Sequence, residues 1–164
     1  MDLARAFGLP LIWRLGAHND ARSVNSAAER AGVPMIATEL GGGGGVDPDI
    51  TDQTEAGLMN ILRLLGMADG EPFAEPPQRI VEIADPMHSA YAPATGLFDR
   101  ATRAGQDVSA GDLLGEFHFI TEPERPSIKI NAMTPGLILA HSHRGMVNRG
   151  ELLALIVQDV KDTA

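Results

Sequence analysis

The sequence lacks several features that would indicate particular classes of protein. It contains no cysteine, which excludes a disulfide framework and a thiolate metal site. No apolar run approaches the roughly 20 residues that a membrane helix needs, so we expect no membrane partner. Lys and Arg number 13 against 22 Asp and Glu, and without a basic stripe we expect no nucleic-acid partner. The N-terminus shows no basic region followed by an apolar run, which predicts a cytoplasmic protein without a secretion signal.

The first part of the 164-residue chain, residues 1–68, alternates between helix and strand patterns. Helix patterns cover 2–7, 23–32 and 51–66, and apolar runs of strand length cover 11–15 and 34–40. This alternation is typical of a parallel sheet covered by helices, which is an α/β architecture. Because two parallel strands cannot bury both faces of such a layer, this part reads as the end of an α/β domain.

Each expected helix has recognisable signals at its ends. Gly8 closes the first helix, and Ser23 is suited to cap the second. In the third, Asp52 and Glu55 have capping-box spacing and Gly66 stops the helix. The apolar faces predicted to be buried are Val24, Ala27, Ala28 and Ala31 in the second helix, and Leu58, Ile61, Leu62 and Leu65 in the third.

Residues 69–77 have the composition of a linker, and residues 78–164 read as a β-rich domain with an internal repeat. Ala-x-x-x-Gly-Leu occurs at 92–97 and again at 132–137, and Val-x-x-Gly-acid-Leu-Leu occurs at 108–114 and again at 147–153. An offset of about 40 residues predicts two related β-units arranged as a pseudo-symmetric sandwich. Gly111 and Gly150 should occupy equivalent turns.

One acidic residue stands at an unusual position. Glu39 precedes five consecutive glycines, Gly41 to Gly45, with only Leu40 between them. From the residues alone, two interpretations stay open: a slack surface loop, or a reactive carboxylate at a strand end where other groups approach closely. A phosphate-binding loop is excluded, because the glycines are not followed by Gly-Lys-Ser/Thr and the acids at 47, 49 and 52 would repel phosphate.

Residues 1–68 resemble the C-terminal half of the catalytic domain in the succinylglutamate desuccinylase/aspartoacylase family, in the branch that includes N-acetyl-diaminobutyrate deacetylases. The resemblance rests on "ARAFGLP", on "SAAERAGVPMIATELGGGG" and on the helix "GLMNILRLLGM". It implies the C-terminal part of an α/β/α zinc-carboxypeptidase-like domain, followed by a β-sandwich domain of the barrel-sandwich-hybrid type. The chain would then be a fragment or a natural truncation, or another chain would supply the missing N-terminal piece.

The resemblance also implies an activity. The family hydrolyses the amide bond of N-acylated amino acids with one zinc, and Glu39 matches the glutamate that serves as general base and then general acid. The zinc ligands of the family lie upstream of the matching segment. We therefore expect no metal site in this chain, no zinc bound to it alone, and no activity of the chain in isolation.

Other side chains are weaker candidates for the substrate site. His18 follows the first expected strand and could line a cleft beside Glu39. Arg14, within that strand, could bind a substrate carboxylate through its guanidinium, and Tyr91, before the first β-unit, could contribute a hydroxyl if its segment folds back over the cleft. Ordinary loop, surface or packing roles fit these three residues as well. His141 and His143 have a chelating spacing but no third ligand at a recognisable distance in sequence.

The β-units also resemble the barrel-sandwich hybrid of biotinyl and lipoyl carrier domains. At the hairpin where those carriers hold their modified lysine, this chain has "TEPERPS", and Lys129 comes later. The scaffold therefore matches while the functional lysine does not. The alternative to a deacylase is a non-catalytic binding or assembly module on this scaffold, and an incomplete sheet edge would favour pairing with another chain, for example in a homo-oligomer.

Overall fold

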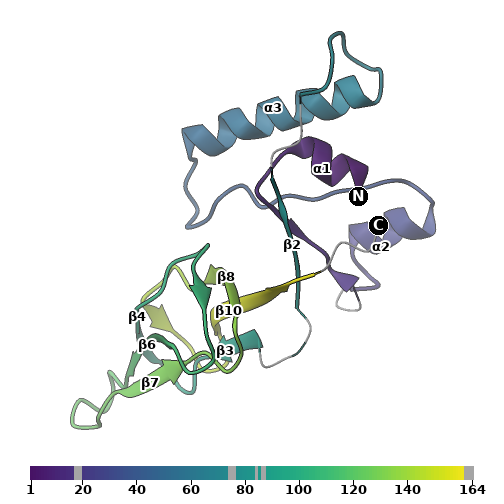
Figure 1. The fold of residues 1–164 in the computed structure, drawn as a ribbon. Helices are drawn as coiled ribbons and strands as arrows, with labels where there is room; N and C mark the ends of the chain where they lie inside the picture. The colour runs from purple at the N-terminus through teal and green to yellow at the C-terminus, as the bar shows by residue number, and fades with distance from the viewer. Residues whose placement is uncertain (17–19, 74–76, 84, 86–87, 161–164) are drawn as a thin grey trace. The chain divides into compact units, whose positions relative to one another are not determined.

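A computed structural model describes residues 1–16, 20–73, 77–83, 85 and 88–160. Contacts divide the chain into two compact units, Met1–Val81 and Glu82–Val160 (Figure 1). Taken together, the two units have both helices and sheets: the described elements of the first are three helices and a strand pair, and those of the second are strands. No helix in the described ranges is long and apolar enough to cross a membrane.

The first unit combines three helices with a short parallel strand pair. Its elements are α1 (Asp2–Phe7), β1 (Leu11–Trp13), α2 (Val24–Arg30), α3 (Pro48–Leu64) and β2 (Arg79–Glu82). β1 and β2 run parallel, with Ile12 opposite Ile80, and both of these side chains are buried. From the sequence, residues 79–82 are predicted to belong to the β-rich domain. In the structure they form β2, which pairs with β1 near the N-terminus.

Two of the predicted helix ends are confirmed. Gly8 ends α1 in the left-handed region, with φ of 81°. Ser23 caps α2, because its Oγ accepts a hydrogen bond from the Ser26 N–H at 3.1 Å. The predicted apolar face of α2 is wrong: Val24 is 67% exposed and Ala27 and Ala31 are also exposed. The side chain that α2 buries is Ser26, whose hydroxyl donates to the Asp20 carbonyl at 2.8 Å.

Helix α3 begins earlier than the sequence reading placed it. Asp47 is the N-cap, accepting from the N–H groups of Asp49 and Ile50 at 2.9 and 3.3 Å, and Pro48 fills the first turn. The predicted start near Asp52 is wrong, because an Asp cap followed by Pro is itself a complete start signal. Gly66, with φ of 68°, follows the helix as predicted.

Helices α1 and α3 pack closely through Gly57 and Asn60. A Cβ on Gly57 would lie well inside van der Waals distance of the Phe7 carbonyl oxygen, so the backbones meet there. Asn60, 1% exposed, donates from Nδ2 to the Ala6 carbonyl at 2.7 Å, and its Oδ1 accepts from the Phe73 N–H at 2.7 Å. The predicted stripe is therefore not the buried face, and its members Leu58 and Leu65 are 54% and 55% exposed.

The strand predicted at 34–40 is wrong. These residues form an extended segment without strand pairing, and Met35 and Leu40 are 39% and 48% exposed. A buried strand needs a neighbouring strand on at least one edge. Within the described part of the chain, no strand lies beside this segment. The segment therefore has the apolar pattern of a buried strand but does not form one.

The second unit consists of two four-stranded arrays over one core. One sheet has the order β7-β6-β4-β9, and in the other β3 and β8 flank β10 while β5 pairs with β8. The buried side chains come from both sheets and form one cluster that includes Phe98, Phe117, Ile138, Leu153 and Ile156. The strands are β3 (Ser89–Tyr91), β4 (Gly96–Arg100), β5 (Asp107–Val108), β6 (Leu113–His118), β7 (Ile128–Asn131), β8 (Gly136–His141), β9 (Met146–Val147) and β10 (Leu152–Asp159).

The repeat in the sequence is accompanied by a repeat in the strand pairing. The two sheets have equivalent strand orders, β3-β10-β8-β5 in one and β7-β6-β4-β9 in the other. Strands at the same place in the two orders are four apart in chain order. The turns correspond as well. Gly111 and Gly150 have φ of 91° and 83°, and their N–H groups donate to the carbonyls of Ala132 and Ala92 at 2.7 and 2.8 Å.

Candidate functional site

Glu39 lies in the first unit, at the exposed end of the extended segment and next to the glycine loop. Gly41, Gly43 and Gly44 have φ of 83°, 70° and 78°, a region that side-chain-bearing residues rarely adopt. The glycines therefore have a conformational role in turning the chain toward α3. A Cβ on any residue from Gly42 to Gly45 would meet nothing within 4 Å, so the loop leaves open space.

A small cavity of about 170 Å³ lies where the glycine loop meets the start of α3. A Cβ on Gly41 would come 3.2 Å from Ile50 Cδ1, which shows how closely the loop approaches the helix there. Glu39 does not line the cavity, but its neighbour Leu40 does. The lining residues are Leu40, Gly45, Val46, Asp47, Ile50, Thr51 and Thr54. The sequence did not predict that the glycine loop meets the start of α3 here. The pair Asp47-Pro48 is the sequence signal for that helix start.

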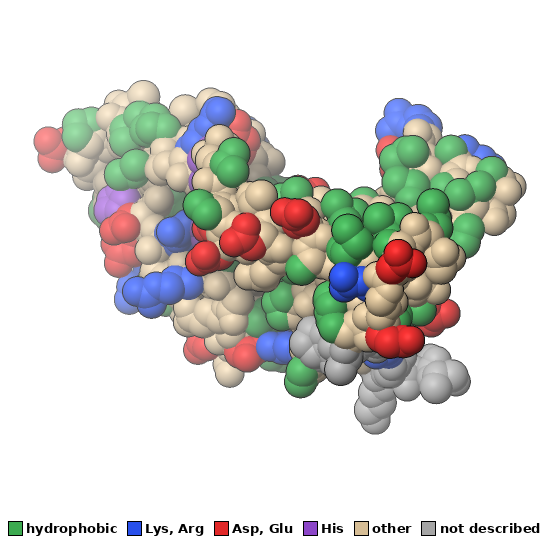
Figure 2. Space-filling model, turned by 90° about the horizontal axis from the view of Figure 1, so that it is seen from above, with side chains coloured by type: hydrophobic (Ala, Val, Ile, Leu, Met, Phe, Trp, Pro, Cys, Tyr) green, Lys and Arg blue, Asp and Glu red, His purple; other side chains and the backbone are tan. Residues whose placement is uncertain are grey.

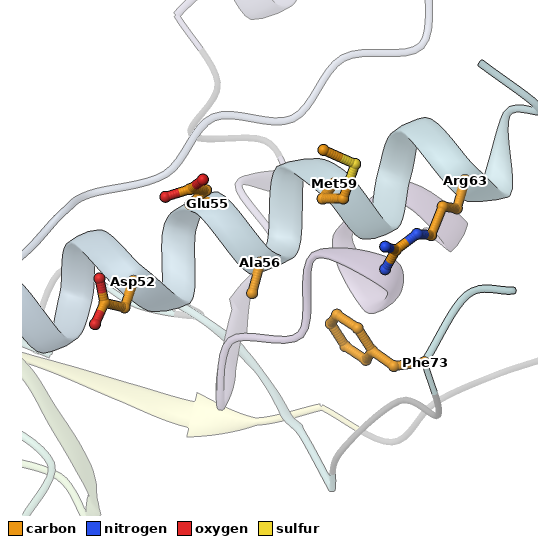
Figure 3. Close-up of a pocket in the computed structure, with 6 residues that line it drawn as sticks. All are labelled: Asp52, Glu55, Ala56, Met59, Arg63 and Phe73. Atoms are coloured by element: carbon orange, nitrogen blue, oxygen red, sulfur yellow. The ribbon is translucent and has the colours of Figure 1, made fainter. Parts of the chain in front are cut away.

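A second hollow, of about 420 Å³, lies on another side of α3 (Figure 3). Its lining consists of Asp52, Glu55, Ala56, Met59, Arg63 and Phe73, with acidic side chains toward one end of the helix and Arg63 toward the other. Arg63 Nε donates to the Asp69 carbonyl at 3.1 Å, which fixes the position of its guanidinium. Glu39 does not take part in this hollow, and no sequence motif indicated it.

The weaker candidates lie in different parts of the chain. Arg14 is exposed and belongs to the same unit as Glu39, and its backbone N–H donates to the Val81 carbonyl at 2.8 Å. Tyr91 is 56% exposed and belongs to the second unit, on β3. His18 lies outside the described residues. Their roles in substrate binding therefore stay predictions.

The described residues do not offer a zinc site of their own. A search of them finds no group of three or more His, Cys, Asp or Glu side chains that could hold a metal ion. His141 is in contact with Arg100, whose Nη1 lies 2.9 Å from His141 Nε2. His88 is buried, and its Nδ1 accepts from the Asp85 N–H at 3.1 Å, which is a packing role.

Residues 1–65 match the sequence model of the succinylglutamate desuccinylase/aspartoacylase catalytic domain. Over this stretch the chain is similar to that family. Along 162 residues it is 28% identical to the N-alpha-acetyl-L-2,4-diaminobutyric acid deacetylase of Halomonas elongata, covering 98% of this chain and 47% of that protein. Glu39 and the glycine loop lie inside the matched catalytic segment.

Solved structures of the family extend the similarity to the whole chain. The succinylglutamate desuccinylase/aspartoacylase from Rhodobacter sphaeroides is 27% identical with a TM-score of 0.86, over 99% of this chain and 49% of that one. The product-bound ectoine utilization protein EutE (DoeB) from Ruegeria pomeroyi is 25% identical with a TM-score of 0.88, over 96% and 48%. The chain thus corresponds to the C-terminal half of these proteins and spans about half their length.

Proposed function

We propose that this chain supplies part of the active site of a zinc-dependent deacylase, which hydrolyses the amide bond of an N-acylated amino acid. In this proposal the first unit is the C-terminal part of an α/β/α zinc-carboxypeptidase-like domain, and the second is a β-sandwich domain. The observation that carries the proposal is the position of Glu39. It is a solvent-exposed carboxylate beside a glycine loop, within the residues that match a catalytic domain.

Two features of Glu39 support its proposed role as general base: its exposure and the glycines beside it. Its carboxylate would take a proton from the attacking water and then give that proton to the leaving nitrogen. Since Glu39 is exposed, water and substrate can reach it. Gly42 to Gly45 carry no side chains into the adjoining space, which leaves room for the backbone of an amino-acid substrate.

The metal belongs to the complete enzyme in this proposal. Zinc would supply Lewis-acid polarisation of the reacting groups when bound. Because the described residues do not provide a ligand set, the proposal assigns to this chain the proton transfers alone. Arg14 would be suited to bind a substrate carboxylate through its guanidinium, and His18 and Tyr91 stay weaker candidates for substrate binding. The binding-module alternative is not favoured, because the match is to a catalytic domain.

The proposal is tested in a chimera that joins the N-terminal half of the Halomonas elongata deacetylase to this chain. Release of free amine from N-alpha-acetyl-2,4-diaminobutyric acid is measured for the chimera and for its Glu39→Gln variant. A positioned general base contributes about 10²–10⁴ in rate, so kcat should fall by at least that factor. KM should change little, because the lost interaction acts in the transition state.

Asp49→Asn is the matched control, since it removes one exposed carboxylate from the same region without touching Glu39. The control should retain activity, and zinc content should be equal in all three proteins. Activity of the Glu39→Gln chimera within about tenfold of the parent chimera would eliminate Glu39 as the base. Loss of zinc together with activity would identify it instead as a ligand or a structural support.

A further inference from the structure

Arg100 and His141 meet where two strands of the second unit end. They come from different sheets, since Arg100 is the last residue of β4 and His141 is the last residue of β8. Nη1 of Arg100 lies 2.5 Å from Nδ1 and 2.9 Å from Nε2 of His141. The guanidinium therefore rests against the imidazole, and the contact joins one sheet to the other.

Both side chains start from the core-facing side of their strands. Side chains alternate along β4, so Arg100 is on the same side as Phe98, which is 5% exposed. His141 lies directly opposite Ala154 in the pair of β8 and β10, and Ala154 belongs to the buried cluster. Because opposed residues of an antiparallel pair share a face, His141 also starts on the core side. Arg100 is exposed and His141 is half-buried, so a ligand can reach them at the end of the core.

This pair is not neutralised by an acidic side chain. Among the described residues, His141 is the only polar partner of the Arg100 guanidinium. Asp99 precedes Arg100 but lies on the other side of the sheet, opposite Glu116. Glu116 in turn accepts a hydrogen bond from Ser127 Oγ at 3.1 Å. The acids next to Arg100 in the chain and in the sheet are therefore not placed to balance its charge.

The chemistry of the two groups favours an anion. A guanidinium stays charged and carries five N–H donors, and Nε and Nη2 of Arg100 have no partner within the described part of the chain. A histidine ring offers one N–H when neutral and a second when it gains a proton near neutral pH. An anion between the two groups would accept hydrogen bonds from both. A dianion would gain more than a monoanion, because the attraction scales with its charge.

The charge of the whole chain does not favour anions. Its formal net charge is −9, and Asp and Glu side chains are distributed over the face of the molecule seen in Figure 2. Such a field repels anions in general. Anion binding would therefore depend on a local arrangement of donors, such as the one that Arg100 and His141 form.

We propose that Arg100 and His141 form a binding site for a tetrahedral dianion, which is sulfate or a phosphate group. The Arg100 guanidinium would donate to two oxygens of the anion, as is usual in pairs of arginine and phosphate, and an N–H of His141 would donate to a third. The bound anion would link β4 to β8 and stabilise the second unit. The site lies within that unit, so the inference does not depend on the proposed deacylase activity.

The test titrates sulfate into the isotope-labelled chain at constant ionic strength and follows it by NMR. Signals of the Arg100 side chain, of the His141 ring and of the backbone amides around them should shift and saturate. We expect a Kd in the millimolar range, because exposed ionic contacts are weak. Acetate, a planar monoanion, should bind at least about threefold more weakly. Inorganic phosphate and glycerol 3-phosphate are the further arms, and the tighter of the two distinguishes a free phosphate from an esterified one.

Two variants remove the donors one at a time. Arg100→Gln should raise the Kd for sulfate at least about tenfold, because a charge-assisted contact is lost. His141→Ala should raise it at least about threefold, because one donor is lost. Arg149→Gln is the matched control, since it removes the same charge from an exposed arginine in the turn after β9. That turn lies toward the other end of β4, because Val147 pairs with Gly96, and the Kd of the control should stay within about twofold of the parent.

Urea unfolding followed by circular dichroism gives a second readout. Sulfate stabilises folded proteins in general, so the measured quantity is the gain in urea midpoint relative to the control variant. The gain should be larger in the parent and in Arg149→Gln than in Arg100→Gln, because a ligand stabilises only the form that binds it. This comparison holds even if Arg100→Gln is itself less stable than the parent.

Four results would overturn the inference. Shifts that rise linearly with sulfate without saturating would indicate an adventitious ion only. An equal increase of Kd in Arg149→Gln and Arg100→Gln would indicate general charge attraction. Acetate that binds as tightly as sulfate would refute a site for a dianion. The same gain in urea midpoint for the parent and Arg100→Gln would refute a bound anion that links the two sheets.

Discussion

Asn60 is the residue whose replacement should most directly separate α1 from α3. Its amide links the carbonyl of Ala6, at the end of α1, with the backbone N–H of Phe73, both at 2.7 Å. The side chain is 1% exposed, so water does not reach it in the folded chain. Asn60→Ala removes both hydrogen bonds at once and leaves space between the helices.

The size of the effect follows from the burial of the two partners. The bond to Ala6 is fully buried, and a buried group left without a partner costs about 1–3 kcal/mol. The bond from Phe73 is only partly buried, so water can replace it and its loss costs about 0.5–1.5 kcal/mol. We therefore expect Asn60→Ala to lower the free energy of unfolding of the first unit by about 1.5–4.5 kcal/mol, the sum of the two contributions.

The fluorescence of Trp13 reports on the unfolding of the first unit alone. Trp13 is the single tryptophan of the chain and lies on β1, in the first unit. Urea unfolding followed by its fluorescence therefore reports on this unit, whatever the second unit does. Gln53→Ala is the matched control, because it deletes an exposed amide on the same helix and should change stability by less than about 0.5 kcal/mol.

Asn60→Leu distinguishes hydrogen bonding from packing. Leucine fills a similar volume but forms neither bond, so it should destabilise the unit about as much as alanine does. If Asn60→Leu restored the urea midpoint of the parent, the contribution of Asn60 would be volume alone. An Asn60→Ala midpoint equal to that of Gln53→Ala would refute the role of the amide entirely.

Three further predictions concern other parts of the chain. Gly57→Ala should destabilise the first unit despite the better helix propensity of alanine, because the new Cβ would overlap a carbonyl of α1. Gly45→Ala should be tolerated, because a Cβ there meets nothing within 4 Å. Trp13 fluorescence in urea measures the stability of both variants. Gly111→Ala and Gly150→Ala should destabilise the second unit equally, each by about 1–2 kcal/mol, because both force alanine into a positive φ. Urea unfolding followed by circular dichroism measures this. Clearly different losses of unfolding free energy in the two variants would contradict the equivalence of the two turns. Hydrogen bonding from the Asn148 backbone N–H and side chain lowers the pKa of Glu151 in the folded chain. The ionised Glu151 should therefore stabilise the second unit fully above the pKa of the unfolded chain, near 4.3, and this stabilisation should be lost as pH falls through the lower folded pKa. An NMR titration that places the pKa of Glu151 at or above the unfolded value would contradict this.

Local signals in the sequence determined the helices and the β-repeat. Ser23, Gly8 and Gly66 act within one turn of the chain, so their effect does not depend on distant residues. The same holds for the turns at Gly111 and Gly150, where a positive φ and a short hydrogen-bonded loop are encoded by the Gly-acid pair itself. Periodicity likewise predicted α3, although the cap at Asp47 was missed because a capping box was placed at Asp52, five residues later.

The tertiary structure decided which faces of those elements are buried and whether an apolar run is a strand. Periodicity shows that Leu58 and Leu65 share a helix face, but whether that face is covered depends on what packs there. In the first unit α1 packs on Gly57 and Asn60 instead, because close approach needs a small residue and the end of α1 needs a hydrogen-bond donor. For residues 34–40 the apolar pattern is intact, yet strand pairing is a property of two segments, and no partner lies beside them in the described part of the chain. Glu39 lies at the end of this segment, and its catalytic role stays a prediction.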